Sequence, residues 1–191
     1  MKSYYNCNAE EYIKSTQNID MTPLWKCFEE LLPTGGRILD AGCGSGRDSL
    51  HFIKSGYNVS AFDSSYAMAD KASALTKIKV RTLSFQKMDY IGEFDGIWAC
   101  ASLLHVPRNE MNDVLLSLHR ALAPNGVMYC SFKNRDVDFT DGERSFTCFT
   151  VDGLRSLLSG SGLFQIIDIF TSFDWRNECW TNAIVKKATS D

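Results

Sequence analysis

A strand, a turn and the start of a helix follow one another in Arg37-Ile38-Leu39-Asp40-Ala41-Gly42-Cys43-Gly44-Ser45-Gly46-Arg47-Asp48. The strand is apolar and ends in an acid, and the turn carries three glycines at alternate positions. Glycine adopts backbone angles that other residues avoid, and it lets the main chain approach a ligand where a Cβ would clash. The N–H groups at the start of the helix then point at that ligand. The segment therefore predicts a site for an adenosyl cofactor.

The type of adenosyl cofactor depends on two positions. The third glycine of a dinucleotide-binding fingerprint would stand at position 47, which is Arg47 here. Asp40 stands at the strand end, where a carboxylate could meet the ammonium group of an amino acid. S-Adenosylmethionine carries such an ammonium and no pyrophosphate, so the sequence favours it over a nicotinamide dinucleotide.

These residues resemble the first motif of the class I S-adenosylmethionine-dependent methyltransferases, and four later stretches are similar to the later motifs of that superfamily. Asn58 to Asp63 ends in an acid 23 residues after Asp40, near the ~20-residue spacing of a carboxylate that binds ribose hydroxyls. The other three stretches are Val80 to Phe85 with Lys87-Met88-Asp89, Phe94 to Pro107, and Leu122 to Tyr129. Over residues 36–132 the chain is identified as a member of this superfamily.

Periodicity predicts an α/β fold in which strands alternate with helices near 46–55, 66–76, 108–122 and 150–160. An earlier apolar helical stripe runs from Pro23 towards Pro33, and two strand-like runs end the chain as a hairpin. The resemblance implies a Rossmann-like, seven-stranded, mostly parallel sheet with helices on both faces and a C-terminal antiparallel β-hairpin. We expect one methyltransferase domain over 1–191, with an N-terminal helical lid (1–34), a cofactor-binding core (35–132) and a substrate-side loop, helix and hairpin (133–191).

The resemblance also implies the parts of the cofactor site. The glycine turn and Asp40 would hold the methionyl part, Asp63 the ribose, and the main chain at Cys100 and Ala101 the methionyl amine. Tyrosines of the lid suit a sulfonium cation. The full predicted cofactor set is Tyr5, Tyr12, Asp40, Gly42, Cys43, Gly44, Gly46, Arg47, Asp63, Ser64, Met68, Met88, Asp89, Cys100 and Ala101.

Several members of this set have structural alternatives. Met68 or Met88 would cover adenine with Asp89 near its amino group, but methionine also fills cores. Asp40 and Asp63 could cap helices. Tyr5 and Tyr12 could pack as half-buried aromatics against the sheet edge.

Methyl transfer from a sulfonium is an in-line displacement, so position matters most and a base is needed only where the acceptor must lose a proton. His105 follows the fourth strand and is the candidate base, with a structural role in its loop as the alternative. Arg144 and Arg176 lie in loops rich in charged and aromatic residues, and they would suit an anionic or polar planar acceptor. Residues 46–49 and 56–59 look most like the tellurite-resistance and thiopurine-type branch, whose members methylate small, soft acceptors.

Charge and composition set the remaining expectations. The net charge is −3, which argues against a nucleic-acid partner without excluding a local basic patch. No apolar run approaches the ~20 residues of a membrane span, so we expect a cytoplasmic protein, monomeric or weakly dimeric. The seven cysteines contain no C-x-x-C pair, so neither a disulfide framework nor a metal site is expected.

The predicted function is transfer of a methyl group from S-adenosylmethionine, with S-adenosylhomocysteine as product, to a small-molecule acceptor. A tRNA or protein acceptor is the first alternative, although no N-P-P-[YF] segment follows the fourth strand. A protein that binds S-adenosylmethionine without catalysis is the second, and a nicotinamide oxidoreductase is the third.

Overall fold

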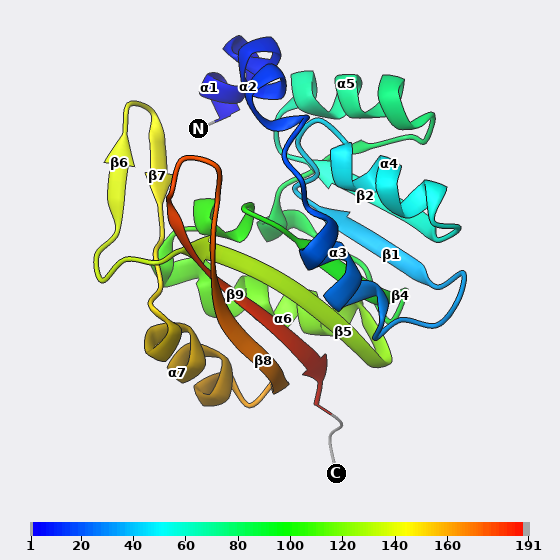
Figure 1. Ribbon diagram of the computed structural model, residues 1–191. Helices are drawn as coiled ribbons and strands as arrows, with labels where there is room; N and C mark the ends of the chain where they lie inside the picture. The colour runs from blue at the N-terminus through cyan, green and yellow to red at the C-terminus, as the bar shows by residue number, and fades with distance from the viewer. Residues whose placement is uncertain (1, 189–191) are drawn as a thin grey trace.

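A seven-stranded sheet forms the centre of the protein in a computed structural model that describes residues 2–188 (Figure 1). The strand order is β3-β2-β1-β4-β5-β9-β8. The first five strands are parallel, and β9 lies antiparallel to both β5 and β8. The sheet strands are β1 (Arg37–Ala41), β2 (Asn58–Asp63), β3 (Arg81–Thr82), β4 (Phe94–Ala99), β5 (Leu122–Lys133), β8 (Phe164–Phe173) and β9 (Cys179–Lys187). This arrangement confirms the predicted fold class, including the terminal hairpin.

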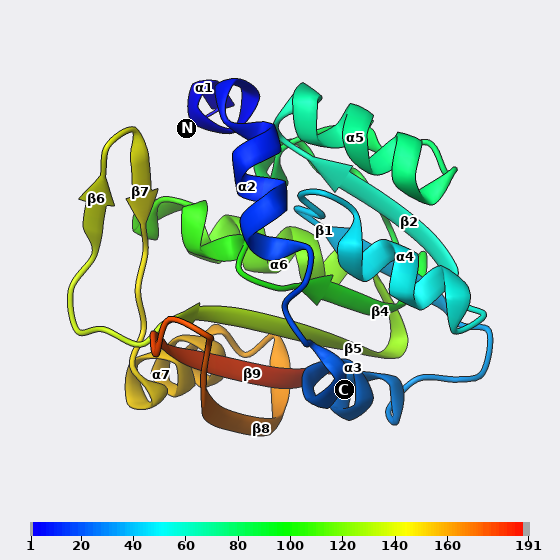
Figure 2. The same ribbon diagram turned by 45° about the horizontal axis from the view of Figure 1, so that its top comes forward.

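Helices cover both faces of the sheet (Figures 1 and 2). One face packs against α3, α4 and α5, and the other packs against α6 and α7. The helices are α1 (Lys2–Cys7), α2 (Ala9–Thr16), α3 (Thr22–Glu29), α4 (Arg47–Lys54), α5 (Tyr66–Thr76), α6 (Met111–Ala121) and α7 (Val151–Ser161), with 3-10 turns η1 (Phe85–Lys87), η2 (Leu103–His105) and η3 (Arg108–Glu110). No helix among residues 2–188 is long and apolar enough to span a membrane.

The central strands are apolar because both of their faces are buried. In β1, Ile38 belongs to the cluster under α3 and α4, and its neighbour Leu39 belongs to the cluster under α6 and α7. In the middle of the sheet Trp98 of β4 stacks on Tyr129 of β5 with ring centroids 4.1 Å apart. Both rings are fully buried.

The third strand is shorter than the sequence predicts. Val80 to Phe85 reads as one apolar strand, but β3 pairs only with Phe62 and Asp63 at the end of β2. The chain then turns inward, and Phe85 packs edge-on against Phe62 with ring centroids 5.2 Å apart. The apolar pattern of this stretch therefore reports burial in a turn rather than a long strand.

Two other elements differ from prediction. The charged loop after β5 contains a small hairpin, β6 (Phe139–Asp141) and β7 (Arg144–Phe146), in which the rings of Phe139 and Phe146 stack at 4.7 Å. The helix expected over 108–122 begins as the 3-10 turn η3, and Leu122 already pairs with Phe94 in the sheet.

Asp48, in the first turn of α4, links three elements through a buried carboxylate. Its oxygens accept hydrogen bonds from Trp25 Nε1 of α3 at 3.2 Å and from Trp98 Nε1 of β4 at 2.9 Å. Arg47 donates to the same carboxylate from Nε and a terminal nitrogen, at 2.7 and 3.0 Å. A third Arg47 nitrogen donates to the Thr16 carbonyl at the end of α2.

The Asp48 network predicts a large effect of a small substitution. Asp48→Asn removes the charge that offsets the partly buried Arg47, and breaking a largely buried ion pair from one side costs about 3 kcal/mol of unfolding free energy. Urea unfolding measures the loss. Asp152→Asn, at the exposed first turn of α7, is the matched control, for which we expect less than about 1 kcal/mol. Equal effects of the two substitutions would show that the network does not stabilise the fold.

Candidate functional site

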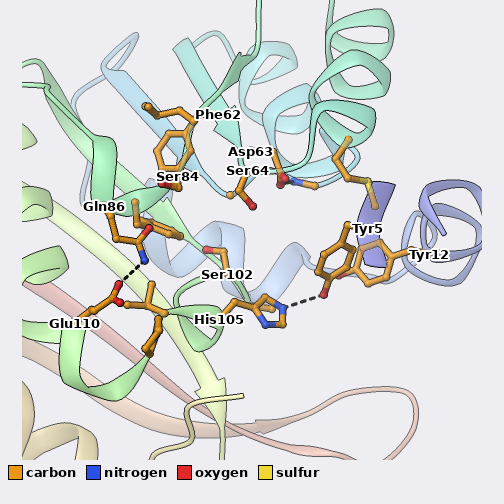
Figure 3. Close-up of a pocket in the computed structure, with 18 residues that line it drawn as sticks. Tyr5, Tyr12, Phe62, Asp63, Ser64, Ser84, Gln86, Ser102, His105 and Glu110 are labelled. Atoms are coloured by element: carbon orange, nitrogen blue, oxygen red, sulfur yellow. Dashed lines mark hydrogen bonds between the residues drawn. The ribbon is translucent and has the colours of Figure 1, made fainter. Parts of the chain in front are cut away.

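A cavity of about 300 Å³ lies at the carboxyl ends of β1, β2 and β4 and is covered by α1 and α2 (Figure 3). This is the edge at which parallel α/β sheets bind ligands. The residues that line the cavity are Tyr5, Tyr12, Gly42, Gly44, Phe62, Asp63, Ser64, Met68, Leu83, Ser84, Phe85, Gln86, Ala101, Ser102, His105, Val106, Pro107 and Glu110.

The glycine turn is hydrogen-bonded to the end of β2. The backbone N–H groups of Gly42 and Cys43 both donate to the Phe62 carbonyl at 2.9 Å. At Gly42 an added Cβ would lie 2.5 Å from the Cβ of Ser102. Gly44 lies on the cavity side with φ +53°, and an added Cβ there would meet no protein atom within 4 Å. The main chain at Gly44 is therefore open to a ligand, as a cofactor cradle requires.

Asp63 presents its carboxylate to the cavity from the end of β2 (Figure 3). Its oxygens accept from the backbone N–H of Gly44 at 2.9 Å and of Ser65 at 2.8 Å. Burial raises the pKa of this carboxyl, and the backbone N–H groups oppose that rise. A carboxylate oxygen accepts more than one hydrogen bond, so Asp63 keeps acceptor capacity for ligand hydroxyls.

Asp40 is directed under the turn rather than into the cavity. It is 2% exposed and accepts a hydrogen bond from Ser49 Oγ at 2.6 Å. Burial, and then the nearby charge of Asp48, raise the pKa of the Asp40 carboxyl to about 8.

The N-terminal helices supply one wall of the cavity. The rings of Tyr5 and Tyr12 meet edge-on with centroids 5.1 Å apart. The helices are attached by polar contacts: Asn6 Oδ1 accepts from Ser65 Oγ at 2.6 Å, and Arg47 donates to the Thr16 carbonyl at 3.1 Å. The cavity is thus enclosed between the sheet edge and a segment that precedes it by at least 20 residues.

His105 faces Tyr5 across this end of the cavity (Figure 3). Its Nε2 is 2.9 Å from the Tyr5 hydroxyl, and its Nδ1 is 3.0 Å from the Ser145 carbonyl on β7. Burial first, and then the positive charges of Arg144 and Lys133, lower the pKa of His105 to about 4. The imidazole is therefore neutral at physiological pH.

The cavity contains some of the residues predicted from the sequence and not others. Those that line it are Tyr5, Tyr12, Gly42, Gly44, Asp63, Ser64, Met68, Ala101 and His105. Those outside its lining are Asp40, Cys43, Gly46, Arg47, Met88, Asp89, Cys100, Arg144 and Arg176.

The residues outside the lining have other neighbours. Asp89 is exposed and forms an ion pair with Arg81 at 3.3 Å, and Met88 packs at the edge of the core. Burial raises the pKa of the Cys100 thiol to about 12, and that of Cys43 well above its usual value.

The two predicted substrate arginines have different surroundings. Arg144 lies over the ring of Tyr4 and pairs with Asp141, and its charge acts on the pKa of Tyr5. Arg176 lies over Trp175 in the exposed β8–β9 loop. Arg144 thus lies next to the wall of the cavity and Arg176 does not line it.

The sequence analysis missed the segment after β3. Leu83, Ser84, Phe85 and Gln86 line the cavity, and Gln86 donates to Glu110 at 2.9 Å at its far side (Figure 3). The signal that could have found them is the end of the parallel strand, because loops at the carboxyl edge converge on the ligand. The predicted strand ran to Phe85, whereas β3 ends at Thr82, so the prediction did not recognise Leu83–Gln86 as a loop.

Comparisons with known proteins agree with this geometry. Residues 38–126 match the family model described as a methyltransferase domain. YqeM of Bacillus subtilis (strain 168), a methyltransferase by name, is 26% identical over 166 residues, which are 81% of this chain and 67% of that protein. The ubiquinone biosynthesis O-methyltransferase of Dechloromonas aromatica (strain RCB) is 30% identical over 114 residues, 53% of this chain and 46% of that protein. The chain thus spans about two thirds of the first relative and less than half of the second.

A solved structure has the same fold. The 1,6-didemethyltoxoflavin-N1-methyltransferase of Burkholderia thailandensis, crystallised with 1,6-didemethyltoxoflavin and S-adenosylhomocysteine, superposes with a TM-score of 0.83. It is 21% identical, and the match covers 98% of this chain and 87% of that one. At this identity the likeness shows the fold.

The raised pKa of Asp40 predicts how stability depends on pH. The folded carboxyl keeps a proton that the unfolded chain loses near pH 4. The stability that Asp40 contributes is therefore fully present below that pH, and it is lost as the pH rises towards 8. Asp40→Asn removes this loss. We expect the variant to gain stability relative to the wild type by up to about 1.4 kcal/mol per pH unit between pH 5 and 8, measured by urea unfolding. Asp113→Asn on the exposed face of α6 is the control, and a pH-independent difference for Asp40→Asn would contradict the assignment.

Proposed function

The chain belongs to the class I S-adenosylmethionine-dependent methyltransferases, and from this premise we propose that it transfers a methyl group to a small-molecule acceptor. The observation that carries the proposal is the pair formed by the open main chain of Gly44 and the carboxylate of Asp63. Both face one cavity, and the backbone N–H of one donates to the side chain of the other. This pair fits the adenosyl cofactor that the superfamily uses.

We assign the cofactor to residues that line the cavity. Asp63 would accept hydrogen bonds from the ribose hydroxyls, with Ser64 beside it, and the turn at Gly42 and Gly44 would hold the methionyl part. Buried Met68 and the segment Leu83–Gln86 replace Met88 and Asp89 as the surroundings of adenine, since the latter two do not line the cavity. S-Adenosylmethionine supplies an electrophilic methyl group there. The protein has to bind, orient and exclude water.

The acceptor would bind at the end of the cavity bounded by Tyr5, Tyr12 and His105, which we name the acceptor end. Three features favour a small molecule: the cavity is covered by α1 and α2, its volume is near the lower bound of ligand pockets, and the net charge is −3. The Burkholderia enzyme binds 1,6-didemethyltoxoflavin, and the name of the Dechloromonas relative places it in ubiquinone biosynthesis. A tRNA or protein acceptor is the alternative. The likeness to the tellurite-resistance and thiopurine-type branch remains a prediction, because these relatives carry other names.

Calorimetric titration of the purified protein tests the proposal directly. We expect micromolar binding of S-adenosylmethionine and S-adenosylhomocysteine, and no binding of NADH. A radiolabelled methyl transfer assay then compares thiols, phenols, small acids, tRNA and protein as acceptors. Label that enters only tRNA or protein would overturn the small-molecule proposal, and binding of NADH alone would overturn the cofactor assignment.

The ribose assignment makes a separate prediction. Asp63→Asn removes the charge while keeping one acceptor oxygen, and we expect S-adenosylmethionine to bind at least about tenfold more weakly, a change of 1.4 kcal/mol. Asp70→Asn, on the exposed side of α5 in the same helix–strand unit, is the matched control. Circular dichroism verifies that both variants fold. An unchanged affinity in the Asp63 variant would remove the ribose role.

A further inference from the structure

Tyr5 and His105 form a hydrogen-bonded pair to which the cofactor assignment above gives no role. The Tyr5 hydroxyl is 2.9 Å from His105 Nε2, and both residues line the acceptor end. The pair joins two segments 100 residues apart in the chain, α1 and η2. Figure 3 shows the two side chains directed at each other, with the hydrogen bond between them drawn as a dashed line.

The other nitrogen of His105 fixes which way the hydrogen bond runs. Nδ1 lies 3.0 Å from the Ser145 carbonyl oxygen, and a carbonyl can only accept. Nδ1 therefore carries the proton. In a neutral imidazole Nε2 is then the acceptor, so the Tyr5 hydroxyl donates its proton to Nε2.

The direction of this bond leaves both lone pairs of the Tyr5 oxygen as acceptors, one for the nearby Arg144 guanidinium and one for a ligand at the acceptor end. A hydroxyl oxygen accepts up to two hydrogen bonds in addition to donating one. We propose that Tyr5 and His105 form a proton relay that removes the proton of a hydroxyl acceptor during methyl transfer. This inference rests on the proposed function and names its acceptor class. Tyr5 is then a catalytic residue, and His105 acts through it.

The proton balance of the step is complete with the residues present. As the acceptor oxygen forms its bond to the methyl carbon, the carbon–sulfur bond breaks and its electron pair stays on sulfur. The acceptor proton passes to Tyr5 Oη, and the Tyr5 proton passes to His105 Nε2. The products are a methyl ether, S-adenosylhomocysteine, neutral Tyr5 and an imidazolium, whose proton passes to solvent before the next turnover.

The surroundings of the pair favour a hydroxyl over an amine. Arg144 of β7 and Lys133 of β5 act on His105, each with a carboxylate partner, Asp141 and Glu178. Tyr12 of α2 and Asp63 of β2 also face Tyr5. Near these positive charges His105 is a weak base, and it is neutral before the step. A weak base suffices here, because the oxonium that forms when a hydroxyl oxygen is methylated is a much stronger acid than an imidazolium. A methylated amine would keep its proton, and a thiolate has none to lose.

Nitrogen NMR tests the relay without any turnover. In protein labelled with ¹⁵N-histidine, we expect the proton of His105 on Nδ1. Tyr5→Phe should shift the Nε2 resonance, because it removes the donor and keeps the ring. Tyr4→Phe is the matched control, since Tyr4 is its chain neighbour and lies outside the cavity lining. A proton on Nε2, or an Nε2 resonance that ignores Tyr5→Phe, would overturn the relay.

Kinetics tests the acceptor class, with catechol as the hydroxyl probe and thiophenol as the probe that is already ionised. We expect Tyr5→Phe and His105→Gln to lower kcat for catechol about 100-fold with little change in KM, as general-base removal does. Both variants should retain methylation of thiophenol, and Tyr4→Phe should resemble the wild type with both probes. Equal losses with the two probes would overturn the relay, and wild-type methylation of thiophenol or benzylamine without any hydroxyl would overturn the acceptor class.

Calorimetry with S-adenosylmethionine separates the two possible failures. If the wild-type protein binds the cofactor and either result above goes against the relay, the inference is wrong and the proposed function stands. If the wild-type protein does not bind the cofactor, the proposed function itself has failed.

Discussion

The attachment of the glycine turn to the end of β2 is the interaction on which the site depends. Two backbone N–H groups of the turn share the Phe62 carbonyl, and the N–H of Gly44 binds the carboxylate of the next residue, Asp63. These bonds need the ends of two parallel strands side by side, which the β1–β2 register provides by pairing Ala41 with Phe62. The bonds orient Asp63, set the conformation of the turn and begin α4 at a fixed place. The β1–β2 register therefore places the glycine turn and Asp63 side by side in the lining of the cavity.

Two buried carboxyl groups, those of Asp40 and Asp48, lie near each other beneath the glycine turn. Asp48 accepts hydrogen bonds from Arg47, Trp25 and Trp98, whereas Asp40 accepts from Ser49. Asp40 keeps its proton first because burial disfavours its charged form, and then because its charge would lie beside that of Asp48. A positively charged ligand above the turn would change that balance. The same network holds α3 through Trp25, so the glycine turn, α3 and the central strand form one unit.

The sequence predicted the features that depend on neighbouring residues alone. The apolar run of β1, the glycines after it and Asp63 at the end of β2 are each visible in a window of a few residues, and the alternation of strands and helices follows from periodicity. Sequence did not reveal the Tyr5–His105 pair, because nothing in either neighbourhood indicates a partner 100 residues away. It also extended the third strand through the segment that lines the cavity. A buried turn and a buried strand have the same apolar composition, and only the pairing of β3 with two residues of β2 distinguishes them.

Arg47 shows how one wall of the cavity is attached to the rest of the protein. In the sequence it marks a departure from the dinucleotide fingerprint, and in the structure it connects Asp48 to the Thr16 carbonyl. Of the described residues up to Thr16, none belongs to the three buried apolar clusters of the protein. The helices α1 and α2 are therefore attached by polar contacts and by the tyrosines that face the cavity. Net hydrogen bonds contribute only about 1 kcal/mol each, and Ala9 is the one buried apolar side chain among the described residues of this segment whose side chains are assigned. A ligand that fills the cavity would contact Tyr5 and Tyr12, and it would thereby add apolar contact to a segment that polar bonds attach to the sheet edge.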